Sequence, residues 1–266
     1  MTVPALFRVA AFAALASAVP AAGALPACRA ESGPQTTALV ELYTSEGCDS
    51  CPPADRWLSG TFAPGRPPEG AIALAFHVDY WDRLGWKDRF AAPAWTQRQY
   101  DSARARRSDL VYTPQVLLQG RDVDWRDGSR VAAAVAAAAH APARASVALA
   151  AVPQADAVAV SVVARVPAPA DRRGARVFVA LTGEHLVSEV KAGENAGKRL
   201  VHDHVVRALG DVAIDAAGTG TGTVVLPWPA EAGAAVTVSA FVQNVENGAV
   251  LQALSLPLAA DCVPVR

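Results

Sequence analysis

Two hydrophobic patterns follow each other along the chain. Up to about residue 141, continuous apolar runs alternate with segments of helical spacing. From Ala145, short β-branched runs are separated by Pro, Gly and Asp turns. Continuous apolar runs are typical of strands buried on both faces, whereas β-branched, alternating runs are typical of half-buried strands. The first part therefore predicts an α/β domain, and the second predicts an all-β domain.

The elements expected in the first part follow the order βαβα and then ββα. Pro93 suits the first turn of a helix, and Asp127-Gly-Ser129 suits the start of the next. The predicted strands are 37–43, 71–78, a run within 111–120 and 123–125, and the predicted helices begin near 54, 92 and 130. This order predicts a central sheet flanked by helices.

The elements expected in the second part are strands only. They are 146–150, 157–163, 175–181, 201–209, 222–226, 235–242 and 250–256. Six or seven such runs at short spacing predict a β-sandwich. We place a domain boundary near Ala141-Pro142, with one domain at 36–141 and a sandwich-like domain at 145–260.

Residues 1–24 have the features of a cleaved signal peptide. A positively charged start ends at Arg8, an apolar run covers 9–19, and Ala22-Gly-Ala24 supplies the small residues of a cleavage site. The apolar run is too short and too rich in Ala for a stable membrane span. We therefore expect an exported protein, either periplasmic or secreted.

The composition of the 266 residues, 52% hydrophobic and 18% charged, is that of a globular protein. The formal net charge is −1, and the basic group Arg104-Ala-Arg-Arg107 lies in a helical segment. A surface that follows nucleic-acid phosphates is therefore not expected.

Four cysteines in an exported chain are expected to form disulfides. Cys28 follows the expected cleavage site and Cys262 lies near the carboxyl end, so a structural disulfide between them is the simplest assignment. The alternative is a lipoprotein attached through Cys28. Pro26, in Leu25-Pro-Ala-Cys28, fits the lipid-attachment pattern poorly.

Cys48 and Cys51 form a C-x-x-C pair between a predicted strand and a predicted helix, a setting typical of a thioredoxin-like redox site. We expect Cys48 to be the exposed nucleophile and Cys51 the resolving thiol. Glu46, Asp49 and Asp55 surround the pair and oppose thiolate formation. The pair is therefore predicted to be a weak oxidant, acting as a reductant or as a largely static disulfide.

Proline residues shape two segments near this pair. Pro52-Pro53 is expected to delay the start of the helix until after Cys51, because a residue before proline avoids the α region. Thr113-Pro114 precedes a predicted strand, where thioredoxin-like folds carry a cis-proline beside the C-x-x-C. We expect a cis bond there and a backbone that pairs with an extended substrate peptide, the alternative being a trans proline in a turn.

Tyr80, Trp81 and Trp86 follow the second strand, at the sheet edge where the first strand delivers the cysteines. They are expected either to form an apolar shelf for a substrate peptide or to pack under the second domain. His77, which ends the second strand, is expected to be a satisfied core histidine.

A metal site is not predicted, and no cofactor is expected. His202 and His204 would share one face of a strand, near Glu184 and His185, but this spacing alone is not diagnostic. Asn195, His202 and Arg207 are expected instead to orient a loop against the first domain.

Several segments together resemble a known family. They are 41–55, 76–88, 112–115 and 193–202 with 205–207, within a similarity that extends from about 37 to 256. The family is an exported thioredoxin-like family that is known as a domain of unknown function. The resemblance implies a thioredoxin-like domain and export, and it supplies no substrate or reaction.

From these residues we predict an exported thiol–disulfide oxidoreductase that acts on protein thiols or disulfides. Cys48 and Cys51 would carry out the exchange, and Thr113-Pro114 would position the substrate together with the aromatic loop. The alternative is a non-catalytic binding module in which the C-x-x-C disulfide is structural.

Overall fold

The computed structural model describes residues 28–64, 68–228, 231 and 235–258. These residues form fourteen strands, four α-helices and one short 3₁₀ helix. Strands predominate, so the described part of the chain is mostly β. No helix within it is long and apolar enough to cross a membrane.

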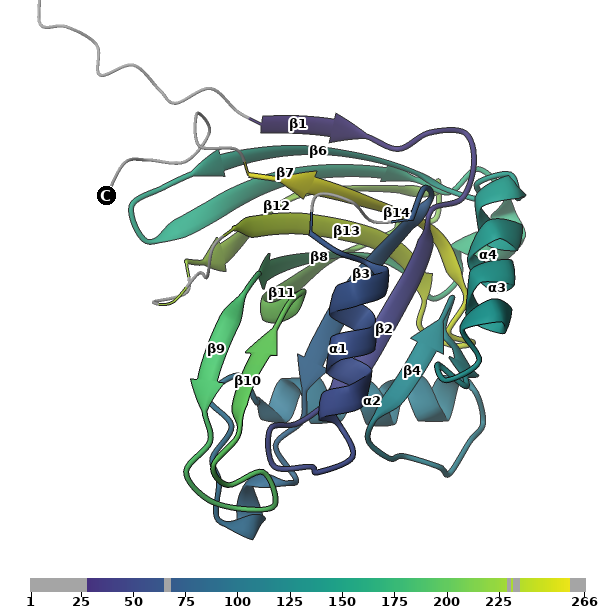
Figure 1. The fold of residues 1–266 in the computed structure, drawn as a ribbon. Helices are drawn as coiled ribbons and strands as arrows, with labels where there is room; N and C mark the ends of the chain where they lie inside the picture. The colour runs from purple at the N-terminus through teal and green to yellow at the C-terminus, as the bar shows by residue number, and fades with distance from the viewer. Residues whose placement is uncertain (1–27, 65–67, 229–230, 232–234, 259–266) are drawn as a thin grey trace, which may run out of the picture.

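The largest element is an eight-stranded mixed sheet (Figure 1). β2 pairs in parallel with β3, β3 pairs in parallel with β11, and the other neighbours are antiparallel. In sheet order the strands are β14 (Val250–Pro257), β13 (Val236–Asn244), β8 (Ala175–Gly183), β11 (Val205–Ala213), β3 (Ala71–His77), β2 (Ala38–Thr44), β4 (Gln115–Leu118) and β5 (Arg121–Val123).

A second, antiparallel sheet stacks on the β14–β13–β8 part of the first. Its strands are β1 (Cys28–Glu31), β6 (Ser146–Pro153), β7 (Ala157–Arg165) and β12 (Thr219–Pro227). A two-stranded ribbon of β9 (Leu186–Glu189) and β10 (Arg199–His202) extends from the large sheet toward the end of the molecule that carries the β2–α1 loop (Figure 1).

The prediction of an α/β thioredoxin-like domain followed by a separate all-β sandwich-like domain is wrong. Strands from both sides of residue 141 belong to one sheet, and the edge of β3 that a self-contained domain would leave open is taken by β11. The remaining strands of the second part stack on that sheet together with β1. Hydrophobic patterns are local, so they predict single strands but not which distant strands pair.

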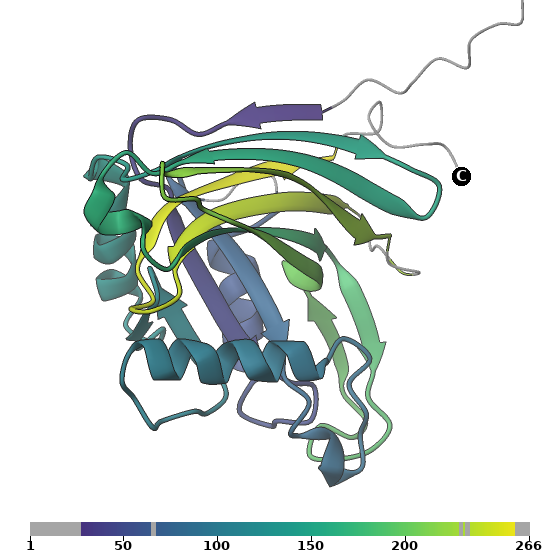
Figure 2. The ribbon, with the colours of Figure 1, turned by 180° about the vertical axis from the view of Figure 1, so that it is seen from behind.

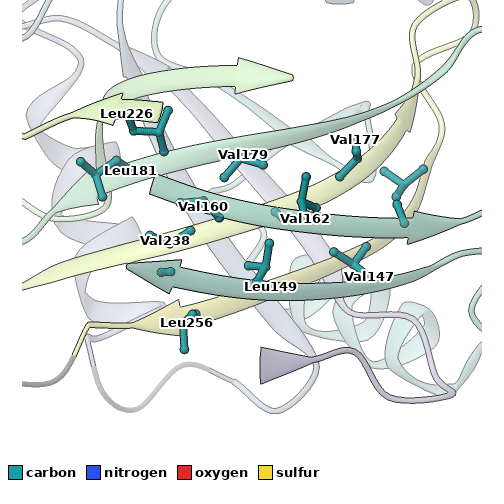
Figure 3. Packing of buried hydrophobic residues seen from close by; sticks show 14 of the residues in the cluster. Val147, Leu149, Val160, Val162, Val177, Val179, Leu181, Leu226, Val238 and Leu256 are labelled. Carbon is teal, nitrogen blue, oxygen red and sulfur yellow. The ribbon is translucent and has the colours of Figure 1, made fainter. Parts of the chain in front are cut away.

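Apolar side chains of the two sheets meet in a sandwich core (Figure 3). Along β6 and β7 alternate residues point inward, and Val147, Leu149, Val160 and Val162 are at most 3% exposed. Leu181 of β8 belongs to the same core. Because full burial of one Val or Leu side chain stabilises by about 1.5–3 kcal/mol, this core is a main source of stability.

Helices cover β2 and β3 on both faces, which explains the continuous apolar runs of these strands. α1 (Pro52–Thr61) and α3 (Gly128–His140) pack on one face, and α2 (Pro93–Ala105) packs on the other (Figures 1 and 2). All three lie close to where the sequence predicts them. The short helices η1 (Asp82–Leu84) and α4 (Pro169–Arg172) complete the fold.

Candidate functional site

The loops that follow β2 and β3 leave the sheet at one edge, as parallel pairing requires. Thr44 and His77, the last residues of these strands, are partners in the register. The first loop carries Cys48 and Cys51 into α1, and the second carries the aromatic residues. The predicted proximity of the two loops is therefore confirmed.

Cys48 and Cys51 are joined by a disulfide, with 5.4 Å between their Cα atoms. Cys51 is the N-cap of α1, which begins at Pro52, so the predicted late start of the helix is confirmed. The positive end of the helix dipole consequently lies at Cys51 and not at Cys48. Neither cysteine has exposed surface, in contrast to the exposure expected of a nucleophile at Cys48.

The loop between β9 and β10 (residues 190–198) is bonded to the C-x-x-C segment. The side-chain amide of Asn195, itself fully buried, donates to the carbonyl oxygens of Glu46 and Cys48, at 2.8 Å each. The backbone N–H of Asp49 donates to Glu194 Oε2 at 3.0 Å. These bonds hold the β9–β10 loop over the disulfide, and Asn195 orients a loop against the first part of the chain, as predicted.

Five ionisable side chains lie next to the disulfide loop, each at most 7% exposed. We call them the buried ionisable cluster, and they are Glu46, Asp55, His77, Asp88 and His202. Glu46 precedes Cys48 by two residues, and Asp55 lies in the first turn of α1, where its backbone N–H donates to the carbonyl oxygen of Cys51 (3.1 Å). Members of the cluster therefore lie on both sides of the C-x-x-C segment along the chain.

Three contacts of Asp88 anchor one end of the cluster. His77 Nδ1 is 2.7 Å from Asp88 Oδ2, and that oxygen also accepts from the backbone N–H of Glu46 at 2.9 Å. The other Asp88 oxygen accepts from the backbone N–H of Phe90. Asp88 thus ties the loop after β3 to the loop that contains the cysteines.

His202 bridges the other end. Its Nε2 is 3.4 Å from Glu46 Oε1, its Nδ1 is 3.8 Å from Asp55 Oδ2, and its ring centroid is 4.8 Å from that of His77. The other Asp55 oxygen accepts from the Thr44 hydroxyl at 2.8 Å. His202 comes from β10, so a strand of the second part of the chain completes the cluster.

Several buried atoms of the cluster have no hydrogen-bond partner within the described part of the chain. They are Glu46 Oε1, Asp55 Oδ2, His77 Nε2 and both ring nitrogens of His202. Leaving a buried polar group unpaired costs about 1–3 kcal/mol. The expectation that His77 is a fully satisfied core histidine is therefore met at one ring nitrogen only.

The cluster separates the pKa values of its carboxyl groups. Although burial works in the opposite direction, His77 and the backbone N–H groups of Glu46 and Phe90 lower the pKa of Asp88 to about 2. Burial raises the pKa of Asp55, against the opposing effect of His202 and His77. The pKa of His77 is raised by Asp88 despite its burial. Asp88 is thus held ionised, and Asp55 is biased toward the protonated form.

The Thr113-Pro114 bond is cis, as the sequence predicts. Trp81 Nε1 donates to Thr113 Oγ1 at 2.7 Å, and a Cβ placed on Gly47 would lie 3.0 Å from Trp81 Cβ. Trp81 therefore connects the cis-proline segment to the residue just before Cys48. A role of Thr113 and Pro114 in positioning a substrate stays a prediction.

Tyr80 and Trp81 lie beside each other, with 6.5 Å between their ring centroids, whereas Trp86 contacts other residues. Trp86 Nε1 donates to Glu46 Oε2 at 2.7 Å, and its Cβ lies 3.2 Å from a Cβ built on Gly193 of the β9–β10 loop. Tyr80 donates to Gln99 Oε1 at 3.2 Å, and burial raises its pKa to about 12. Because these side chains remain partly exposed, a contact with a substrate stays a prediction.

His202 and His204 do not share a strand face. His204 lies in the turn after β10 with φ 59°, and its Nδ1 is 3.4 Å from Glu184 Oε1, whereas His202 belongs to the cluster. Among the described residues, no group of three or more His, Cys, Asp or Glu side chains is arranged to hold a metal ion.

The sequence did not predict the cluster. From the sequence, Glu46 and Asp55 are charges around the thiols, and Asp88 has no predicted role. The available signal is limited to Glu46, which follows a buried apolar strand, and Asp55, just inside a helix. His202 could not be added, because its place depends on how β10 sits beside α1.

Cys28 opens β1 and is buried. Cys262 and the predicted signal peptide, residues 1–24, lie outside the described residues. The Cys28–Cys262 disulfide and the export of the protein stay predictions.

Two solved structures resemble this chain over most of its length. Protein AGR_C_4864 from Agrobacterium tumefaciens is 27% identical, with a TM-score of 0.58 over 85% of this chain and 96% of that chain. HBP35 of Porphyromonas gingivalis is 14% identical, with a TM-score of 0.60 over 83% of this chain and 74% of that chain, a likeness of fold alone.

A search of curated proteins found no match. A family model described as "Protein of unknown function (DUF1223)" matches residues 39–243, more than half of the chain. The chain therefore belongs to the DUF1223 family.

Proposed function

We propose that this protein is exported and exchanges disulfides with protein substrates through Cys48 and Cys51. The observation that carries the proposal is a disulfide set beside buried carboxyl and imidazole groups, several of whose atoms have no hydrogen-bond partner among the described residues. Such groups are costly, and shifted pKa values are typical of functional sites. A disulfide that only stiffens a loop needs no such neighbours.

The exchange runs in two steps in the reductive direction. The Cys48 thiolate attacks a substrate disulfide, forms a mixed disulfide and expels one substrate sulfur as a thiolate. The Cys51 thiolate then attacks Cys48 Sγ, closes the protein disulfide and releases the second substrate sulfur. The substrate gains two electrons and two protons, and an external dithiol reduces the protein pair again.

The buried ionisable cluster supports the proton transfers of this cycle. Each thiol must lose a proton before it attacks, and the protons must be held close to the sulfur atoms. Asp55 and His202 have free acceptor atoms beside the first turn of α1. The acidic members also disfavour thiolates, so the pair prefers the disulfide form and acts as a reductant.

Access to the sulfur atoms requires the β9–β10 loop to move. Both cysteines are fully buried, whereas Asp49 and Ser50 between them are exposed. Asn195 and Glu194 hold the loop on this segment through three hydrogen bonds. Breaking those bonds opens the bridge to a substrate.

The reduction potential of Cys48–Cys51, measured in dithiothreitol redox buffers, tests the proposal. We expect a value above about −300 mV, the upper limit of most structural disulfides. The wild-type protein should reduce insulin, and Cys48→Ser should not. Cys51→Ser should accumulate a mixed disulfide with a substrate. A potential far below that limit, or activity that survives in Cys48→Ser, would refute the proposed exchange.

A second candidate is a non-catalytic binding module in which the disulfide is structural. The complete burial of both cysteines favours it. This candidate predicts a potential below about −300 mV and no insulin reduction, so the same measurements separate the two functions.

A further inference from the structure

A cavity of about 670 Å³ lies between α2 and the strands β8, β11 and β13. α2 covers the face of the large sheet opposite α1 (Figure 2). None of its lining residues belongs to the disulfide site. Its volume falls within the range of small-molecule pockets, about 300–1,000 Å³. The cavity is therefore a separate place where a ligand can bind.

Apolar side chains form much of the cavity wall. Phe178 of β8 and Leu209 of β11 line it and are only partly buried, and Val245 is 44% exposed. Phe178 stacks on Phe241 with 5.1 Å between the ring centroids, which fixes the plane that the ring presents. These side chains offer an apolar surface beside a rigid aromatic ring.

Arg98 supplies a hydrogen-bond donor in this apolar wall. Its side chain is 9% exposed, and its Nε and Nη2 donate to Glu41 Oε1 at 2.8 and 2.6 Å. Nη2 also donates to Gln243 Oε1 at 3.0 Å. Nη1 makes no hydrogen bond to any described residue, and it is not fully buried. One donor of a mostly buried guanidinium thus remains for a ligand.

The charges that line the cavity are already compensated. Each of the five charged lining side chains has an ion-pair partner. The pairs are Arg98–Glu41, Arg104–Asp101, Arg176–Asp211 and Arg173–Glu246. A charged ligand would bring an uncompensated charge into a partly buried space, which is costly.

We propose that this cavity binds a neutral, largely apolar molecule that presents a carbonyl oxygen to Arg98. An aromatic ketone has this chemistry, because its ring system packs on Phe178 and Leu209 while its oxygen accepts from the guanidinium. The site is independent of the disulfide exchange, and the test uses the full protein with Cys48–Cys51 oxidised.

The probe is Prodan, a fluorescent, neutral naphthyl ketone, titrated with the protein and followed by the shift of its emission. We expect saturable binding, and we expect the anionic dye 1-anilino-8-naphthalenesulfonate to bind more weakly. Competing 2-acetonaphthone should displace Prodan about tenfold better than 2-ethylnaphthalene, because only the ketone accepts a hydrogen bond from a charged donor.

Leu209→Trp fills the cavity and should weaken Prodan binding at least tenfold. Val225→Trp is the matched control, because Val225 is 60% exposed on β12 and lies outside the cavity. Arg98→Lys keeps a charge for Glu41 and should remove the advantage of the ketone over the hydrocarbon. The proposal fails if Prodan does not bind, if Leu209→Trp binds it like the wild type, or if the anionic dye binds more tightly.

Discussion

The sandwich core and the disulfide site bury side chains to a similar depth but with opposite chemistry. Val160 and Leu181 in the sandwich have no exposed surface, and His77 and Asp88 near the disulfide are 1% exposed. In the sandwich, burial itself stabilises the fold. At the disulfide site, burial opposes charge, and ion pairs together with backbone and side-chain donors offset part of that cost.

The sandwich core therefore stabilises the fold, whereas burying the ionisable groups at the disulfide site costs free energy. Apolar burial does not depend on pH, whereas the contribution of a titrating pair does. Variants in the two regions should therefore differ in how their free energy of unfolding changes with pH.

His77→Gln should destabilise the protein by about 3–5 kcal/mol, because Asp88 would be left as a buried charge without its partner. The stabilisation by Asp88 exists above its usual pKa of 3.8 and is lost as pH falls toward about 2. The stabilisation by His77 is full below its usual pKa of 6.5 and is lost as pH rises through its raised value. Urea unfolding should therefore show the largest cost between pH 4 and pH 6.5. A cost that stays the same as pH falls from 5 toward 2 would contradict this account.

Leu181→Ala should destabilise by about 2–5 kcal/mol through a cavity in the sandwich core. The cost should be the same at pH 5 and pH 9, and the reduction potential of Cys48–Cys51 should not change. Val225→Ala, at a side chain that is 60% exposed, is the control and should stay within about 0.5 kcal/mol of the wild type. If the destabilisation by Leu181→Ala changes with pH, the sandwich core and the disulfide site do not differ in their pH dependence as we expect.

Replacing both Cys48 and Cys51 by Ser should cost about 2 kcal/mol, because a disulfide that closes a loop of four residues restricts the unfolded chain only slightly. Denaturant unfolding measures this loss. A loss of 4 kcal/mol or more would show that the bridge holds the surrounding loops together, and it would favour the structural alternative over exchange.

Asn195→Ala should cost about 1–2 kcal/mol, since the carbonyl groups of Glu46 and Cys48 lose their donor. The more informative result is kinetic. The disulfide should react faster with dithiothreitol, because the β9–β10 loop opens more often. Asn247→Ala, at an exposed turn, is the control and should leave the rate unchanged. An unchanged rate in Asn195→Ala would mean that this loop does not limit access.

Asp55→Asn should have the smallest effect and the opposite sign. The raised pKa of Asp55 means that ionisation costs free energy in the folded state, and this cost grows as pH rises above its usual pKa of 3.8. The variant should therefore gain stability relative to the wild type between pH 4 and pH 8, as thermal unfolding across this range can show. If the variant loses stability relative to the wild type as pH rises, the ionised form of Asp55 stabilises the folded state, and this prediction is wrong.

Local features were predictable because short-range rules decide them. Pro52-Pro53 sets the start of α1 after Cys51, since a residue before proline avoids the α region. The cis bond at Thr113-Pro114 is an exception, because local rules favour the trans form and its prediction came from the comparison with thioredoxin-like folds. The runs that became β2 and β3 and the segment that became α2 were recognisable from their apolar periodicity.

The sequence was enough to predict the C-x-x-C between a strand and a helix, the start of α1 after Cys51 and most single elements. It was not enough to predict that β11 pairs with β3, which joins strands of both expected domains in one sheet. Nor could it predict that His202 and Asn195 reach the disulfide from the second part of the chain. Backbone hydrogen bonds can join almost any two strands, so the packing of the whole molecule selects the partner and decides which distant side chains meet.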